Sequence, residues 1–198
     1  VSHYSQTALT AVTLAFPLQN LLIAVSVGTS IGVNSLLSRK LGARDLAAAK
    51  KAAGNGLTLS LISWVFFAII GLFFTKAFIS FFSSDPELIR MGTQYSAICL
   101  FFSLGIFIDI TCERILQGTG DTFHPMIIQG TGAIVNIILD PILIFGLFGF
   151  PRMGVLGAAI ATVFAQHVSA VLAICYVKKN REIVLARPSF RLEKKTVK

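Results

Sequence analysis

The stretch AAGNGLTLSLISWVFFAIIGLFFT, residues 52–75, contains no Asp, Glu, Lys or Arg, and it decides the fold class. Four more uncharged stretches lie at 1–38, 91–108, 122–139 and 153–177. Each reaches the roughly 18 to 20 residues that a helix needs to cross about 30 Å of hydrocarbon. A soluble core hides one such segment, but not five in 198 residues. The sequence therefore predicts an all-α protein, a polytopic membrane helical bundle with about five transmembrane helices.

The overall composition agrees with membrane insertion. Charged residues make up 13% of the chain, whereas soluble domains carry about a quarter. We expect transmembrane spans at about 9–38, 55–82, 89–115, 124–149 and 154–177. The three cysteines lie in or beside these spans without C-x-x-C spacing, which favours small buried residues over metal or redox roles.

The basic residues between the spans predict an orientation. Fourteen of the seventeen Lys and Arg residues fall in the link after the first span, at Arg114, or in the tail from Lys178 onward. The other three are Lys76, Arg90 and Arg152. Because basic residues near span ends stay cytoplasmic, the first span starts outside and the C-terminal tail is cytoplasmic. This pattern explains the net charge of +8 better than nucleic-acid binding does, since no base-reading motif is present.

Turn-forming residues mark several boundaries. Ser83 to Glu87 offers a helix N-cap with Pro86 just inside the next helix, and Gly118 to Asp121 interrupts the chain before the fourth span. The segment from Arg44 to Lys51 is equally consistent with a short amphipathic surface helix and with a solvated linker. Small residues four apart, Gly28 with Gly32 and Gly157 with Ala161, predict close helix packing.

Asp140 is the outstanding polar residue at membrane depth, where an ionisable side chain is costly and marks a functional site by default. Asn136 precedes it by four residues, so both side chains lie on one helix face. Pro141 removes a backbone hydrogen bond and can kink the helix, which frees a carbonyl nearby. A carboxylate, an amide and a freed carbonyl suit Na⁺, while a desolvated carboxyl suits a proton. The alternative is an Asp that is neutralised by a helix partner for packing alone.

Asp109 and Glu113 form a second pair four residues apart, near the cytoplasmic end of the third span. They are consistent with an acidic lining for a cationic substrate, and also with simple contact to water or to Arg114. Gln129 and Gln166 suit either a polar substrate cavity or hydrogen bonds between helices. His124 and His167 lack partners at ligand spacing, so we expect no metal site.

Several segments together resemble the multidrug and toxic compound extrusion (MATE) family. They are Gly32 with the link SRKLGARD at 38–45, LQGTGDT at 116–122 with Pro125-Met126, NIILDP at 136–141 and GVLGAAIAT at 154–162. The resemblance rests on their order and spacing and covers nearly the whole chain. It implies helices two to six of the first of two six-helix lobes at 1–178, and a basic cytoplasmic linker at 179–198. On this reading the chain is a fragment without the first helix and the second lobe.

The resemblance also implies a function. Members of the family exchange Na⁺ or H⁺ for organic compounds across the plasma membrane, by alternating access of the two lobes to a central cavity. Their proposed cation site uses an Asp on the first helix, matched by no residue here. It also uses an Asn and an Asp on the fifth helix and a Thr on the sixth, which Asn136, Asp140 and Thr162 match. We therefore expect a transporter with no cofactor beyond the coupling ion, and no enzyme.

Three other readings remain open from the sequence. A flippase for lipid-linked sugars belongs to the same superfamily, although the interior acids favour cationic cargo. Gly118-Thr119-Gly120-Asp121 spells the G-x-G-D of intramembrane aspartyl proteases, but it falls between spans, and that chemistry needs two carboxyls brought together from separate spans. A membrane scaffold without transport is the third.

Overall fold

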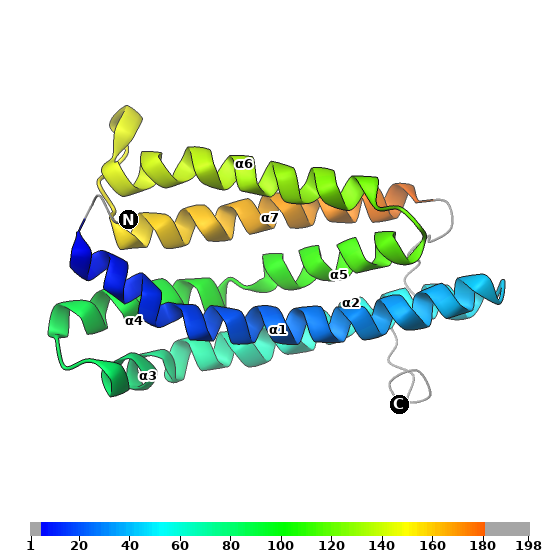
Figure 1. The fold of residues 1–198 in the computed structure, drawn as a ribbon, viewed down its shortest axis with the longest axis horizontal. Coiled ribbons are helices and arrows are strands. Elements are labelled where there is room, and N and C mark those ends of the chain that lie inside the picture. Colours follow the sequence, from blue (N-terminus) through cyan, green and yellow to red (C-terminus); the bar gives the residue numbers. More distant parts are fainter. Residues whose placement is uncertain (1–4, 181–198) are drawn as a thin grey trace. The chain divides into compact units, whose positions relative to one another are not determined.

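Residues 5–180 are described by the structure, a computed structural model, and they form helices without a strand. Figure 1 shows these helices in chain order. They are α1 (Gln6–Gly42), α2 (Leu46–Phe73), α3 (Thr75–Phe82), α4 (Pro86–Phe101), α5 (Leu104–Gly118), α6 (Phe123–Phe145), the 3-10 turn η1 (Leu147–Gly149) and α7 (Val155–Lys179). The predicted linker beyond Asn180 lies outside the described residues.

The predicted membrane architecture is confirmed in outline. Helices α1, α2, α6 and α7 are long and apolar enough to cross a bilayer, and α4 with α5 make a fifth span if the pair is counted as one bent crossing. Large apolar side chains remain exposed along these helices, such as Phe66 at 60% and Ile137 at 70%. In a helix that satisfies its own backbone hydrogen bonds, such side chains are suited to face lipid.

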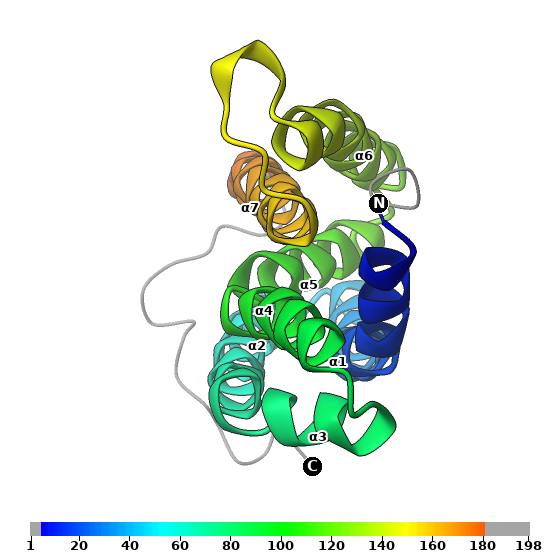
Figure 2. The same ribbon diagram turned by 90° about the vertical axis from the view of Figure 1, so that its left-hand side faces the viewer.

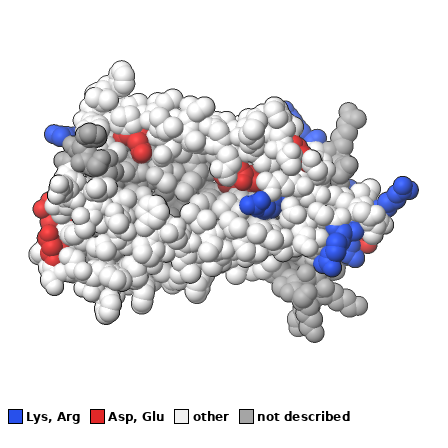
Figure 3. Space-filling view, in the orientation of Figure 1, with Lys and Arg blue, Asp and Glu red and all other residues white. Residues whose placement is uncertain are grey.

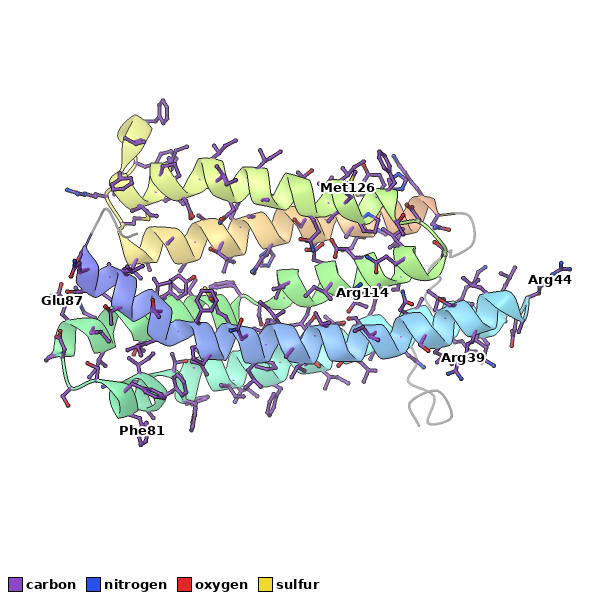
Figure 4. All side chains as sticks on the ribbon, in the orientation of Figure 1. Arg39, Arg44, Phe81, Glu87, Arg114 and Met126 are labelled. Carbon is purple, nitrogen blue, oxygen red and sulfur yellow. The ribbon has the colours of Figure 1, made fainter. Side chains whose placement is uncertain are left out.

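Two predicted spans are divided. The expected span 55–82 is α2 followed by α3, with Phe74 between them. Figure 4 shows the Phe81 side chain pointing away from α3. The expected span 89–115 breaks at Phe102 and Ser103, where the Ser103 hydroxyl donates to Leu100 O at 2.7 Å. A serine hydroxyl that binds a nearby carbonyl offers the backbone an alternative to the next helical turn.

Helix starts follow the local capping chemistry. Asp85 Oδ1 accepts the Glu87 amide at 2.9 Å and Pro86 begins α4, as predicted. Asp45 Oδ1 accepts the Ala48 amide at 3.0 Å and caps α2 in the same way. Of the two alternatives for the segment from Arg44 to Lys51, the helix is right from Leu46 onward, but these alanine-rich residues are the first turns of α2 and not a separate short helix.

The chain divides into two compact units. Unit 1 comprises Val1–Ile23, Val65–Ser103 and Gly132–Gln166, and unit 2 comprises Ala24–Trp64, Leu104–Thr131 and His167–Lys198. Helices α1, α2, α6 and α7 contribute residues to both units, whereas α3 and α4 belong to unit 1 and α5 belongs to unit 2.

Unit 1 packs through small side chains. Its core joins Ala8 and Ala15 of α1 to Tyr95 of α4 and to Ala158 and Ala159 of α7. The unit 1 parts of α6 and α7 lie side by side in both ribbon views (Figures 1 and 2).

The predicted close approach at Gly157 is present in unit 1. A Cβ on this residue would lie 2.5 Å from Leu143 O, so the two backbones meet where Gly157 has no side chain. Gly146, with a φ of 73°, provides the left-handed residue that ends α6.

Unit 2 combines an apolar core with a hydroxyl cluster. Leu37, Ile115 and Val177 are almost fully buried in its core. The Thr111 hydroxyl lies 2.9 Å from that of Ser30 and 2.6 Å from that of Ser60, so it joins α5 to α1 and α2.

The predicted packing role of Gly28 and Gly32 was wrong for the described residues. A Cβ added at either position meets no atom within 4 Å. Small residues permit close packing, but they do not ensure that a partner helix is there.

The described basic side chains of the two predicted membrane sides fall in different units, while the orientation itself stays a prediction. Arg114 and the described basic residues of the first link and of the end of α7 belong to unit 2, while Lys76, Arg90 and Arg152 belong to unit 1. In Figure 3 the Lys and Arg side chains gather at the end of unit 2 where α1 gives way to α2. Figure 4 labels Arg39 and Arg44 there.

Candidate functional site

The predicted cation-site residues come together in unit 1, where α6 lies against α7. Asn136 and Asp140 are one turn apart on α6, and Asn136 Nδ2 lies 3.5 Å from Thr162 Oγ1 on α7. Thr162 Oγ1 also donates to Ala158 O at 2.9 Å, which holds the hydroxyl toward its own helix. All three side chains are partly buried. Sequence spacing predicted the Asn136–Asp140 face, the family resemblance predicted Thr162 beside it, and the structure brings Thr162 to 3.5 Å from Asn136.

Asp140 has unused binding capacity. Its Oδ1 is buried and has no hydrogen-bond partner among the described residues. Pro141 follows it, and α6 continues through this proline to Phe145. Because proline has no N–H, the carbonyl of Ile137 loses its usual donor four residues later. A carboxylate oxygen and a backbone carbonyl are therefore both available on the same stretch of α6.

Two residues that sequence reasoning missed also belong to this part of unit 1. Tyr95 on α4 is buried close enough to Asp140 for the two side chains to interact electrostatically. Gln19 on α1 donates from Nε2 to the Tyr95 hydroxyl at 3.3 Å. A buried Tyr usually needs a partner for its hydroxyl, but nothing in the spacing of residues 19, 95 and 140 indicates that three helices bring them together.

The other predicted site residues are divided between the units. Asp109, Glu113 and Gln129 belong to unit 2, and Gln129 Nε2 donates to Glu113 Oε2 at 3.0 Å. Both acids are buried, with side chains 7% and 5% exposed. Gln166 is partly buried on α7 in unit 1. The substrate-lining role of these four residues stays a prediction.

The G-x-G-D segment lies between α5 and α6, where Asp121 caps a helix. Its Oδ1 accepts the His124 amide at 3.1 Å, and its Oδ2 lies 2.6 Å from His124 Nδ1. Burial alone raises the pKa of Asp121, but the hydrogen bonds from His124 outweigh this effect and hold the pKa below its usual value. The geometry gives Asp121 a capping role rather than a place beside a second carboxyl.

Metal-binding residues do not gather in the described part of the chain. Within residues 5–180 no three His, Cys, Asp or Glu side chains are arranged to hold a metal ion. The oxygens near Asp140 come from single carboxyl, amide and hydroxyl groups, a mixture that suits a monovalent cation better than a transition metal.

Curated proteins similar to this chain are named as transporters. The chain is 30% identical to the probable multidrug resistance protein YoeA of Bacillus subtilis, over 88% of this chain and 38% of that protein. It is also 30% identical to the probable multidrug resistance protein NorM of Thermotoga maritima, over 94% and 40% of the two chains. The FAD transporter of Shewanella oneidensis is 28% identical over 98% and 43%. The chain thus spans about two fifths of the length of these relatives.

Solved structures of similar sequence share the fold. An inward-facing multidrug resistance MATE family transporter of the MOP superfamily superposes with a TM-score of 0.89 at 28% identity, covering 96% of this chain and 43% of that chain. The outward-facing conformation of such a transporter gives 0.90 at 29% identity, covering 100% and 43%.

These likenesses do not favour the lipid-linked-sugar flippase, because the similar proteins are named as multidrug transporters. They also agree with a multi-pass membrane protein that handles small molecules. The MatE family model matches residues 1–142, the part of the chain that carries most of the segments quoted above. The chain therefore belongs to the MatE family, as its sequence motifs predicted.

Proposed function

We propose that this chain is part of a secondary active transporter that exchanges Na⁺ or H⁺ for organic compounds, with Asp140 as the coupling carboxyl. One observation carries the proposal: the unpartnered, buried Asp140 Oδ1 lies on the α6 face where Asn136 contacts Thr162. An acid at membrane depth that is left without a partner is costly, and a bound cation removes that cost.

The coupling mechanism follows from differential binding. A cation shifts the equilibrium between two packings of a lobe only as far as it binds one packing more tightly than the other. Asp140, Asn136 and Thr162 lie on two helices, so a small displacement of α6 against α7 changes the oxygens that a cation meets. Cation binding on this face favours the state that releases substrate outside.

The partners follow from the family and from the length of the chain. Residues 1–178 act as helices two to six of one lobe, and residues 179–198 act as a cytoplasmic linker toward a second lobe. A further helix and that second lobe complete the transporter in the plasma membrane. The basic residues of unit 2, such as Arg39 and Lys50, support a cytoplasmic position for the end that carries them.

The substrate is a small organic compound, and the interior acids favour a cationic one. The FAD transporter of Shewanella oneidensis supports a second candidate, an anionic nucleotide cofactor. The two candidates differ in charge, so one transport assay with a cationic dye and with FAD separates them.

The test uses the full-length protein that contains this chain, reconstituted in proteoliposomes. Efflux of a cationic dye is followed under an imposed Na⁺ or H⁺ gradient for the wild type, Asp140→Asn and the control Asp85→Asn. The control keeps an N-cap residue on α4, because Asn and Asp cap equally well. We expect gradient-driven efflux that is lost in Asp140→Asn and kept in the control. Efflux that survives in Asp140→Asn would refute the coupling role.

A further inference from the structure

Helix α5 carries two buried carboxyls in unit 2. Asp109 and Glu113 are four residues apart on one face, with side chains 7% and 5% exposed. Asp109 Oδ1 and Glu113 Oε1 are both buried without a hydrogen-bond partner among the described residues. Gln129 on α6 donates to the other Glu113 oxygen at 3.0 Å. One oxygen of each acid thus remains available.

The pair forms no salt bridge in the part of the chain that the structure describes. Arg114 follows Glu113 directly and lies close enough for its charge to act on that carboxyl, but its Nη1 donates to Gln117 at 2.6 Å, and it forms no salt bridge with either acid among residues 5–180. Two like charges that are buried together repel each other, and each loses hydration. Arg114 offsets at most one of the two negative charges, so the pair needs one positive charge from elsewhere.

The hydroxyl cluster does not supply this charge. Thr111, between the two acids in sequence, meets Ser30 and Ser60 on the α1 and α2 side of the helix. Gln129, on the α6 side, is neutral and exposed. The Gln129 amide thus holds Glu113 without adding a charge, and Asp109 Oδ1 and Glu113 Oε1 remain unpartnered.

Unit 2 has further titratable groups on each of its helices, besides Arg44, Asp45 and Asp121 in its described links. The groups on the helices are Arg39 and Lys40 on α1, Lys50 and Lys51 on α2, Cys112 and Arg114 on α5, His124 on α6, and His167, Cys175, Tyr176, Lys178 and Lys179 on α7.

We propose that Asp109 and Glu113 form a second cation site, which takes one monovalent cation, Na⁺ or a proton, on their two unpartnered oxygens. Gln129 is its positioning residue, because its amide holds Glu113 Oε2 and leaves Oε1 for the cation. The site belongs to unit 2, whereas Asp140 belongs to unit 1. This inference deepens the proposed function by adding a second ion to the exchange, but its test measures binding and not transport.

The experiment measures bound radioactive Na⁺ per purified full-length protein, together with the infrared band of protonated carboxyl groups. The first variant carries Asp109→Asn together with Glu113→Gln and is called the Asp109/Glu113 variant. The second carries Asp140→Asn, and the third combines all three changes. Glu87→Gln, a change of an exposed acid, is the control. If the site takes Na⁺, we expect the Asp109/Glu113 variant to bind one Na⁺ per protein fewer than the control. If the site takes a proton, we expect the Asp109/Glu113 variant to bind as much Na⁺ as the control but to lose intensity in the infrared band of protonated carboxyl groups.

The Asp140→Asn variant distinguishes the Asp109/Glu113 site from the site at Asp140, because it removes only the Asp140 carboxylate. A second site predicts that Asp140→Asn still shows Na⁺ binding or a protonated carboxyl that the combined variant loses. If the double change prevents folding, Asp109→Asn alone gives the same readouts, because it removes one of the two charges and keeps the Gln129 bond. Unchanged Na⁺ binding and an unchanged carboxyl band in the Asp109 variants would overturn the proposal. If Na⁺ binding and the carboxyl band change as expected but the full-length protein shows no dye efflux, the second cation site stands and the proposed transport function fails.

Discussion

The side-chain amide of Asn136 lies 3.5 Å from the hydroxyl of Thr162 and so joins α6 to α7 one helical turn from Asp140. This contact is long for a hydrogen bond, and the Thr162 hydroxyl already donates to Ala158 O. Both oxygens of the pair, Asn136 Oδ1 and Thr162 Oγ1, therefore keep lone pairs for a cation beside Asp140.

Replacing Thr162 with Val tests this arrangement. The change removes one oxygen while keeping the shape of the side chain, so we expect cation affinity to fall by roughly tenfold, or about 1.4 kcal/mol. The measurement is Na⁺ or H⁺ dependence of binding in the full-length protein. Thr131→Val is the control, because the Thr131 hydroxyl donates only within its own helix, to Ile127 O. Equal affinity in the Thr162 and Thr131 variants would contradict a ligand role.

Replacing Gly157 with Ala tests the close approach of α6 and α7. The new Cβ would lie 2.5 Å from a backbone oxygen of Leu143, and backbone cannot give way as a flexible side chain does. We expect a loss of about 1 to 3 kcal/mol in the free energy of unfolding. Thermal unfolding in detergent measures it.

Gly28→Ala is the matched control for that variant. A Cβ on Gly28 meets no atom within 4 Å, and Ala favours helix over Gly by up to about 1 kcal/mol. We therefore expect the control to unfold at the same or a higher temperature. Equal destabilisation of both variants would show that the contact with Leu143 does not limit packing.

Replacing Thr111 with Val tests the hydroxyl cluster of unit 2. The Ser30 hydroxyl loses its bond to Thr111, while the Ser60 hydroxyl keeps its bond to Gly56 O. A buried hydroxyl that is left unpaired costs about 1 to 3 kcal/mol. The check is the denaturation midpoint, and the double change with Ser30→Ala should recover part of the loss. No recovery would mean that the unpaired Ser30 is not the cause.

The Asp121 cap predicts a pH dependence of stability. Since the pKa of Asp121 is lower in the folded protein, its carboxylate contributes stability above about pH 4, the ordinary pKa of Asp. This contribution is lost as the pH falls through the lowered value. Asp121→Asn should keep the cap but flatten that part of the stability curve, whereas Asp121→Ala should cost about 1 kcal/mol above pH 4. Thermal unfolding across acidic pH checks both, and identical pH profiles for wild type and Asp121→Asn would refute the assignment.

The positions where the span predictions failed share a physical cause. Hydropathy averages over many residues, so it does not detect that Ser103 binds the Leu100 carbonyl and divides the expected span 89–115. It likewise places the start of α2 too late, because Lys50 and Lys51 look like a link although alanines and the Asp45 cap carry the helix through them. Local hydrogen bonds, and not average polarity, set these boundaries.

The sequence by itself determined that the chain is a helical membrane protein of the MatE family and that Asn136 and Asp140 share a helix face. Uncharged length and the helical period of 3.6 residues are local properties, so they need no knowledge of neighbours. Only the tertiary structure decided that Thr162 meets Asn136, that Tyr95 lies near Asp140, and that Asp109 and Glu113 are each buried with one unpartnered oxygen. These facts depend on which helices pack together, because burial and pairing arise between segments that are far apart in sequence.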